Sequence, residues 1–225
     1  MCRKDNERIL NRQIFGPKNF AAIILFVYLR IHITEITMNH SVNKLASIFK
    51  EMVKNRQTMG CQWKNIALGK EAFGIMKQLP DTLPGEYDSP EKKAELLSQM
   101  LDQMEETESA RFCIEVREYI ASLSPQDEHN FAELQKLRDY TDPSMPMEEY
   151  CKRYRRLLKF DPVERTAEYE AVLPEVEAEV SKELKGAPRG MGFCFGYWAA
   201  KRSALAERGI EWNSPAAMNP RVMFD

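Results

Sequence analysis

The stretch SPEKKAELLSQMLDQM, Ser89 to Met104, decides the fold class of this chain. It begins with a serine, a favoured N-cap residue of helices, and the proline that follows suits the first helical turn. Its apolar side chains then recur every three or four residues, as they do on the buried face of an α-helix. The positions on that face are Leu96, Leu97, Met100, Leu101 and Met104. The stretch therefore predicts an amphipathic helix with one buried side.

The same start signal returns at Ser124 with Pro125 and, with an aspartate, at Asp161 with Pro162. Apolar residues keep a helical spacing through most of the chain, and signals for β-strands are scarce. The three starts are spaced like helical-hairpin repeats, but the small-residue and aromatic consensus of a tetratricopeptide unit is missing. We therefore predict an all-α fold, an irregular multi-helix bundle of helical hairpins. Pro174 should kink or split the long helix that follows Pro162.

The first 37 residues differ from the rest because FAAIILFVYL, Phe20 to Leu29, is the only long uninterrupted apolar run, and a basic stretch precedes it. This order resembles a secretory signal, but no small-x-small cleavage site follows, and the run is too short to cross a bilayer. Translation could instead start at Met38, just before a clean amphipathic helix. We expect one helical domain over residues 38–225. For residues 1–37 three alternatives stay open: an extension outside the folded domain, a packed core element, or a membrane anchor at residues 20–29.

Composition excludes several classes of function. The net charge of -2 argues against a protein whose whole surface binds nucleic acid. The five cysteines are far apart in the sequence and form no C-x-x-C pair, so we expect neither a disulfide framework nor a zinc knuckle. The three histidines form no Glu-x-x-His pair with the many glutamates. We therefore predict no metal site, no cofactor and no catalytic residues, and a cytoplasmic location, where thiols stay reduced.

The sharpest basic cluster is CKRYRRLLK, Cys151 to Lys159. If this segment is helical, several of its cations share one side, where they could bind the phosphates of RNA or DNA. These cations are Lys152, Arg153, Arg155, Arg156 and Lys159. The alternative is a solvated helix face whose charges pair with acids such as those of EVEAEVSKE, residues 175–183. We favour the paired face, because the cluster lacks residues that read bases.

The segment RGMGFCFGYW, Arg189 to Trp198, predicts a glycine-rich turn followed by a helix from about Phe193 to Arg208. Backbone N–H groups of such a turn, together with a helix N-terminus, can bind an anion. The candidate ligand-binding residues are Arg189, Gly190, Gly192, Cys194, Tyr197 and Lys201. The alternative is architectural, with the aromatic side chains forming the buried stripe of the helix. A nucleophilic role for the cysteine is disfavoured, because no histidine partner can be named for it.

The closing sequence GIEWNSPAAMNPRVMFD is too apolar to be left in water, so we expect it to pack back on the bundle as an extended segment. The chain is also polarised, because residues 41–80 carry seven basic and two acidic residues, whereas residues 81–139 carry six and fifteen. The leading hypothesis is a non-catalytic interaction or adaptor protein whose partner is another protein. The alternatives are a small-molecule or anion-binding protein, or an enzyme, that uses residues 186–202, and nucleic-acid binding through residues 152–159.

Overall fold

A computed structural model of the protein describes residues 36–80 and 89–224. Within these ranges the chain forms nine α-helices that pack against each other, together with three short 3-10 helices, and it contains no strand. The all-α bundle predicted from the sequence is therefore confirmed. The apolar run at residues 20–29, with its three alternatives, lies outside the described residues. In the described part of the chain, no helix is long and apolar enough to cross a membrane.

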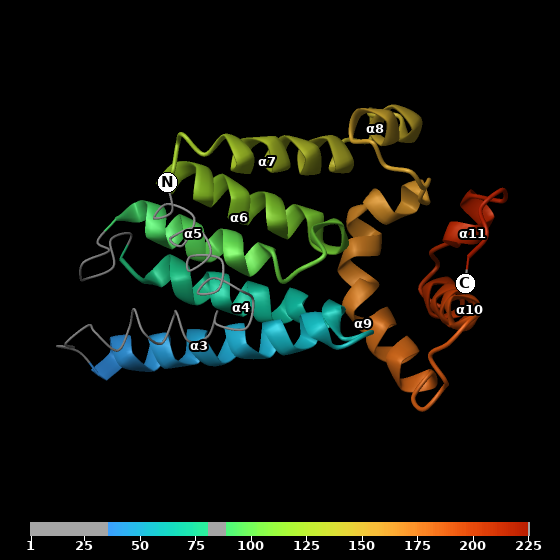
Figure 1. Ribbon diagram of the computed structural model, residues 1–225, viewed down its shortest axis with the longest axis horizontal. Coiled ribbons are helices and arrows are strands. Elements are labelled where there is room, and N and C mark those ends of the chain that lie inside the picture. The colour runs from blue at the N-terminus through green and yellow to red at the C-terminus, as the bar shows by residue number, and fades with distance from the viewer. Residues whose placement is uncertain (1–35, 81–88, 225) are drawn as a thin grey trace, which may run out of the picture.

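Within the described residues, α3 to α7 lie side by side in chain order, from α3 at the bottom of Figure 1 to α7 at the top, and α8 follows at the end of α7. Their bounds are α3 Ile36–Gln57, α4 Asn65–Gln78, α5 Pro90–Leu101, α6 Ala110–Leu123, α7 Glu128–Thr141 and α8 Met147–Arg153. Two 3-10 helices interrupt the connections, η2 at Gln62–Lys64 and η3 at Glu106–Ser109. Short connections make sequential helices neighbours, which is the arrangement expected of helical hairpins.

The helix starts follow local chemistry, although not always at the predicted residue. Ser89 is the N-cap of α5 and Pro90 is its first residue, as predicted. By contrast, α7 does not begin at Ser124. Asp127 caps it, since its carboxylate accepts a hydrogen bond of 2.9 Å from the backbone N–H of Asn130. An acidic side chain is as good a cap as serine, and it also favours the positive end of the helix dipole.

The segment after Asp161 divides into two elements, a short 3-10 helix η4 (Pro162–Arg165) and the helix α9 (Ala167–Glu183). Pro174 lies inside α9, which continues through it. Of the two predicted outcomes, a kink or a split, the split is therefore wrong. The neighbouring side chains Leu173 and Val176 are completely buried. Their packing offsets the hydrogen bond that a proline cannot donate.

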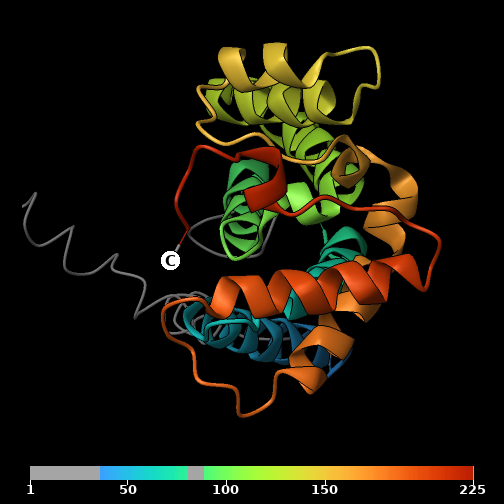
Figure 2. The ribbon, with the colours of Figure 1, turned by 90° about the vertical axis from the view of Figure 1, so that its right-hand side faces the viewer.

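The buried apolar side chains form two clusters. The larger one fills the layers from α3 to α8. The smaller one lies between α9, the helix α10 (Phe193–Ala206) and Trp212. α9 crosses the ends of the bundle helices, and α10 lies beyond it (Figures 1 and 2). The second cluster therefore forms one end of the molecule, and the contacts between α9 and the bundle join the two clusters.

The C-terminal segment packs back on the bundle, as predicted. Trp212 is buried, and its indole N–H donates a hydrogen bond of 2.8 Å to the carboxylate of Glu164. The short helix α11 (Pro215–Met218) follows Trp212 in the chain, and Asn219 comes directly after it. The Asn219 side chain accepts a hydrogen bond from the backbone N–H of Lys159 and donates one to the backbone carbonyl of the same residue. Met223, however, is 95% exposed. The expectation that every apolar side chain of this segment leaves water is therefore wrong for its last residues.

Candidate functional site

Two of the predicted ligand-binding residues, Tyr197 and Lys201, meet inside the second core cluster. They lie one turn apart on α10 and both contact Glu177 of α9. The Lys201 ammonium is 2.7 Å from Glu177 Oε1, and the Tyr197 hydroxyl donates to the same oxygen at 2.6 Å. Both side chains of the ion pair are more than nine-tenths buried. The lysine charge is therefore neutralised within the protein.

Three aromatic rings surround the Lys201 ammonium, those of Tyr169, Tyr197 and Trp212, at 5.6 to 5.7 Å from their centroids. Burial disfavours the charged ammonium, but the tyrosine oxygens and the Glu177 carboxylate hold the pKa of Lys201 well above its usual value. The ammonium thus remains charged at neutral pH. It ties α10 to α9 and to the C-terminal segment.

Two more carboxyl groups face the same ammonium from the bundle side. Burial raises the pKa of Glu108, on η3, to about 7; Lys201 lowers it, while the carboxylates of Glu177, Glu105 and Glu164 raise it. Burial also raises the pKa of Glu164, on η4, against the hydrogen bond from Trp212. The Lys201 ammonium is therefore the positive charge that interacts with the carboxyl groups of Glu177, Glu108 and Glu164. Such a site holds one more proton at acidic pH than it does at alkaline pH.

The other predicted ligand-binding residues lie apart from this buried pair. Arg189 donates a hydrogen bond of 2.8 Å to the backbone carbonyl of Met59, and its guanidinium lies 5.1 Å from the ring of Phe193. Gly192 is the residue before α10, with a φ of 84° that favours glycine, and Gly190 lies in the exposed turn just before it. Cys194 is half-buried in the first turn. Anion binding at this turn stays a prediction, and Tyr197 and Lys201 already have partners of their own.

The basic cluster does not form a helical face. α8 ends at Arg153, and Arg155 adopts a φ of 52°, the only left-handed conformation of a non-glycine residue in the described ranges. The backbone N–H groups of Arg155 and Arg156 bond back to the carbonyls of Lys152 and Cys151, which closes the helix in a Schellman motif. The prediction of one helical side shared by these cations is therefore wrong.

Most cations of the cluster have partners nearby. Arg153 pairs with Asp139 at 2.6 Å and with Glu149 at 2.7 Å. Lys159 lies 3.4 Å from Glu148, and the Arg156 guanidinium lies 4.6 Å from the ring centroid of Phe160. The pairing acids thus come from α7 and α8 and not from residues 175–183. Among the described residues, no carboxylate lies within ion-pair distance of Lys152 or Arg155. Nucleic-acid binding through this segment stays a prediction, and these two cations are the ones that could still contact phosphates.

A row of three aromatic rings joins α10 to the end of the C-terminal segment. The rings of Phe195 and Trp198 meet edge to face at 5.4 Å, and Trp198 meets Phe224 in the same way at 5.2 Å. Phe195 is 51% exposed. The buried residues of α10 are Ala200, Lys201, Ala204 and Leu205, and the aromatic members of the predicted stripe, Phe193 and Tyr197, are half-buried. We call Phe195, Trp198 and Phe224, together with the exposed apolar residues Met191, Val222 and Met223 that lie close to them in the sequence, the α10 apolar surface.

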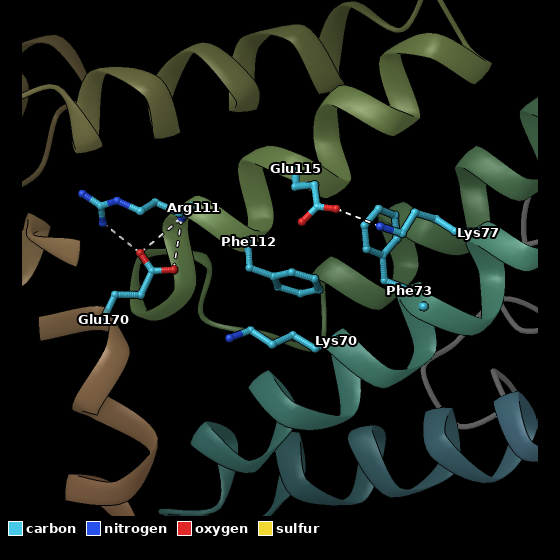
Figure 3. A pocket seen from close by; sticks show the side chains of 8 residues that line it. Lys70, Phe73, Lys77, Arg111, Phe112, Glu115 and Glu170 are labelled. Carbon is cyan, nitrogen blue, oxygen red and sulfur yellow. Dashed lines mark hydrogen bonds and ion pairs between the residues drawn. The ribbon is translucent and has the colours of Figure 1, made fainter. Parts of the chain in front are cut away.

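A cleft of about 450 Å³ lies between α4, α6 and α9 (Figure 3). Phe73 and Phe112, whose rings meet edge to face at 5.9 Å, are the buried aromatic residues that line it. Its charged lining residues are Lys70, Lys77, Arg111, Glu115 and Glu170, and Gly74 completes the lining. No sequence pattern described above predicts this cleft. Its only local signal is KEAFGIMK, residues 70–77, where Lys70, Phe73, Gly74 and Lys77 share one helical face.

Within the described ranges, no group of three or more histidine, cysteine, aspartate or glutamate side chains is placed to hold a metal ion. Comparisons of the chain with models of protein families, with curated proteins and with solved structures find no match. Any assignment of function therefore depends on the geometry of the α10 apolar surface, the buried lysine site and the cleft.

Proposed function

We propose that this chain is a non-catalytic interaction protein that binds another protein through the α10 apolar surface. The observation that carries the proposal is the edge-to-face row of Phe195, Trp198 and Phe224, in which Phe195 is 51% exposed and Trp198 also packs against the second core cluster. Large apolar patches on a protein surface are typical of interaction sites, and aromatic and methionine side chains are enriched there.

Because their neighbours hold these rings in place, the α10 apolar surface is prepared for binding a partner protein. Because each ring already packs against its neighbour, a partner that covers the row would immobilise few additional rotamers. Met191, at 91% exposure, and Met223, at 95%, are flexible apolar side chains that can adapt to the shape of a partner. Rigid aromatic anchors with an adaptable border are the usual composition of a protein interface.

The charges nearby indicate the chemistry of the partner. Arg202 is exposed on α10, one turn beyond Trp198 and two turns beyond Phe195, so it lies on the same side of the helix. Arg221 is exposed three residues before Phe224. An acidic amphipathic segment, with apolar side chains for the rings and carboxylates for these arginines, fits this surface best. Among the described cysteines, Cys61, Cys113 and Cys151 are free thiols, which supports the proposed cytoplasmic location.

A photo-cross-linking amino acid placed at position 195 tests the proposal in the native host. The matched control is position 131, because Phe131 on α7 is also an exposed phenylalanine, at 44% exposure. We expect position 195, and not position 131, to capture one protein that contains an acidic amphipathic segment. Equal capture at both positions, or none at 195, refutes the proposal, and capture of a second copy of this chain replaces it with self-association.

Binding measurements with the captured protein then separate contact from folding. Phe195→Ser and Trp198→Ser should each weaken binding at least about tenfold, as loss of an interface anchor does, whereas Phe131→Ser should change it less than about twofold. Circular dichroism checks that the variants remain folded. If the two serine variants on α10 bind as tightly as the wild-type protein, the α10 apolar surface is not the interface.

A further inference from the structure

We propose that the cleft between α4, α6 and α9 binds a small aromatic carboxylate, with Lys70 pairing with its charge. This site is separate from the α10 apolar surface and does not depend on the function proposed for it. At about 450 Å³, the cleft is in the size range of small-molecule sites. The proposal follows from its charges, its apolar wall and the glycine at its edge.

The charges of the cleft do not balance. Lys77 is paired with Glu115 at 2.9 Å. Arg111 is paired with Glu170 at 2.9 Å, and its other terminal nitrogen donates to the backbone carbonyl of Arg165. These two cations are therefore engaged, and the two carboxylates with them.

Lys70 is the cation that remains. In the described part of the chain no carboxylate lies within ion-pair distance of its ammonium, which is placed 5.9 Å from the ring centroid of Phe112. Glu170 does not serve it, because that carboxylate also accepts hydrogen bonds from the backbone N–H of Arg111. Figure 3 shows the Lys70 and Phe112 side chains together in the middle of the cleft. An anion that enters here finds one uncompensated positive charge beside an aromatic wall.

The wall favours a flat apolar group next to that charge. Phe73 and Phe112 are both buried, and their edge-to-face packing fixes the ring positions. A ligand ring can pack against such rings in the offset or edge-to-face geometries that aromatic pairs prefer. A carboxylate attached directly to this ring would be within reach of the flexible Lys70 side chain.

Gly74 supplies an independent observation. It lies in the interior of α4, where glycine costs about 1 kcal/mol relative to alanine. Gly69 of the same helix has a packing reason, because a Cβ there would lie 2.7 Å from the sulfur of Met104. Among the described residues, no heavy atom lies within 4 Å of the position of a Cβ at Gly74. The described part of the fold therefore shows no steric need for glycine at this position, and the missing side chain leaves this edge of the cleft open.

The test uses 2-naphthoate as the probe and 2-naphthylmethanol as its neutral counterpart, with backbone amide resonances of residues 70–77 as the readout. We expect 2-naphthoate to shift these resonances with a dissociation constant below about 1 mM, and the alcohol to bind at least about tenfold more weakly. Lys70→Gln should reduce the affinity for 2-naphthoate to that for the alcohol. Lys182→Gln, which changes an exposed lysine of α9 outside the cleft, should leave it unchanged.

A second pair of variants tests the position of the site. Gly74→Leu should abolish binding by filling the cleft, and it should fold, because leucine is a better helix former than glycine. The control is Gly196→Leu on α10, another helical glycine with open space at its Cβ position. The proposal is overturned if the probe shifts no resonance of residues 70–77 at about 5 mM, or if Lys70→Gln or Gly74→Leu binds it like the wild-type protein. Shifts confined to α10 would overturn it as well, and they would leave the proposed protein interface intact.

Discussion

Replacing Glu108 by glutamine should remove most of the pH dependence of stability between acidic and mildly alkaline pH. Glu108 lies on η3 and faces the buried Lys201. Burial raises its pKa from 4.5 to about 7 in the folded protein, whereas the unfolded chain keeps the usual value. Glutamine has the same shape and carries no proton that can be lost.

Stability should fall as the pH rises, because the folded protein holds the Glu108 proton more tightly than the unfolded chain does. Between pH 4.5 and 7, the folded protein retains a proton on Glu108 that the unfolded chain has released. The folded state is therefore favoured most at low pH, and this contribution is lost as the pH rises to 7. Glu164, whose pKa is also raised by burial, acts in the same direction, so a smaller pH dependence should remain in the variant. Lys201 retains its charge over this range, because its pKa is raised.

The magnitude follows from the size of the shift. A rise from 4.5 to about 7 corresponds to at most about 3 kcal/mol of stability lost with increasing pH, at 1.36 kcal/mol per pKa unit. The Glu108 side chain is only partly shielded from solvent, and an ionised Glu108 is attracted by Lys201. We therefore expect Glu108→Gln to be about 1 to 2 kcal/mol more stable than the wild-type protein at pH 8, and nearly equal to it at pH 5.

Urea unfolding followed by circular dichroism at pH 5 and pH 8 measures this difference, with equal slopes in urea as the check that both proteins unfold alike. The control is Glu211→Gln, which changes an exposed glutamate of the C-terminal segment and should leave the pH dependence as it is. The reasoning is refuted if Glu108→Gln and the wild-type protein lose the same stability between pH 5 and pH 8. It is also refuted if the variant is the less stable of the two at pH 8.

Three further predictions concern single side chains. Lys201→Met should lower the free energy of unfolding by about 3 to 5 kcal/mol, because it leaves Glu177 buried without a counter-ion. The double variant Lys201→Met with Glu177→Gln should recover part of this stability, as urea unfolding can measure. Arg155→Gly should raise stability by about 1 kcal/mol, because glycine adopts a φ of 52° without strain; a lower melting temperature would contradict this. Burial raises the pKa of Cys113 to about 12, so this thiol should react with a disulfide reagent at pH 8 only after unfolding, as peptide mass spectrometry can check.

The helices could be predicted because their signals are local. Side chains three and four residues apart share a helix face in any fold, and a cap such as that at Ser89 needs only the residues next to it. Where two local caps compete, as Ser124 and Asp127 do, the sequence shows both and the geometry of the turn selects one. The prediction that the segment Cys151 to Lys159 forms one helix is wrong for a related reason. Its composition suits a helix, but the chain must turn after Arg153 to reach α9.

The amphipathic helices and the apolar C-terminal segment that packs over them follow from the amino-acid sequence alone, because helix periodicity and apolar composition act within a few residues. Which charged and aromatic groups have partners follows only from the way the helices pack in three dimensions. The tertiary fold buried Lys201 against Glu177, joined Phe224 to Trp198, and paired Arg111 with Glu170 across the cleft. Ion pairs and ring contacts act over a few ångströms in space, whereas these partners lie between 24 and 59 residues apart in the sequence.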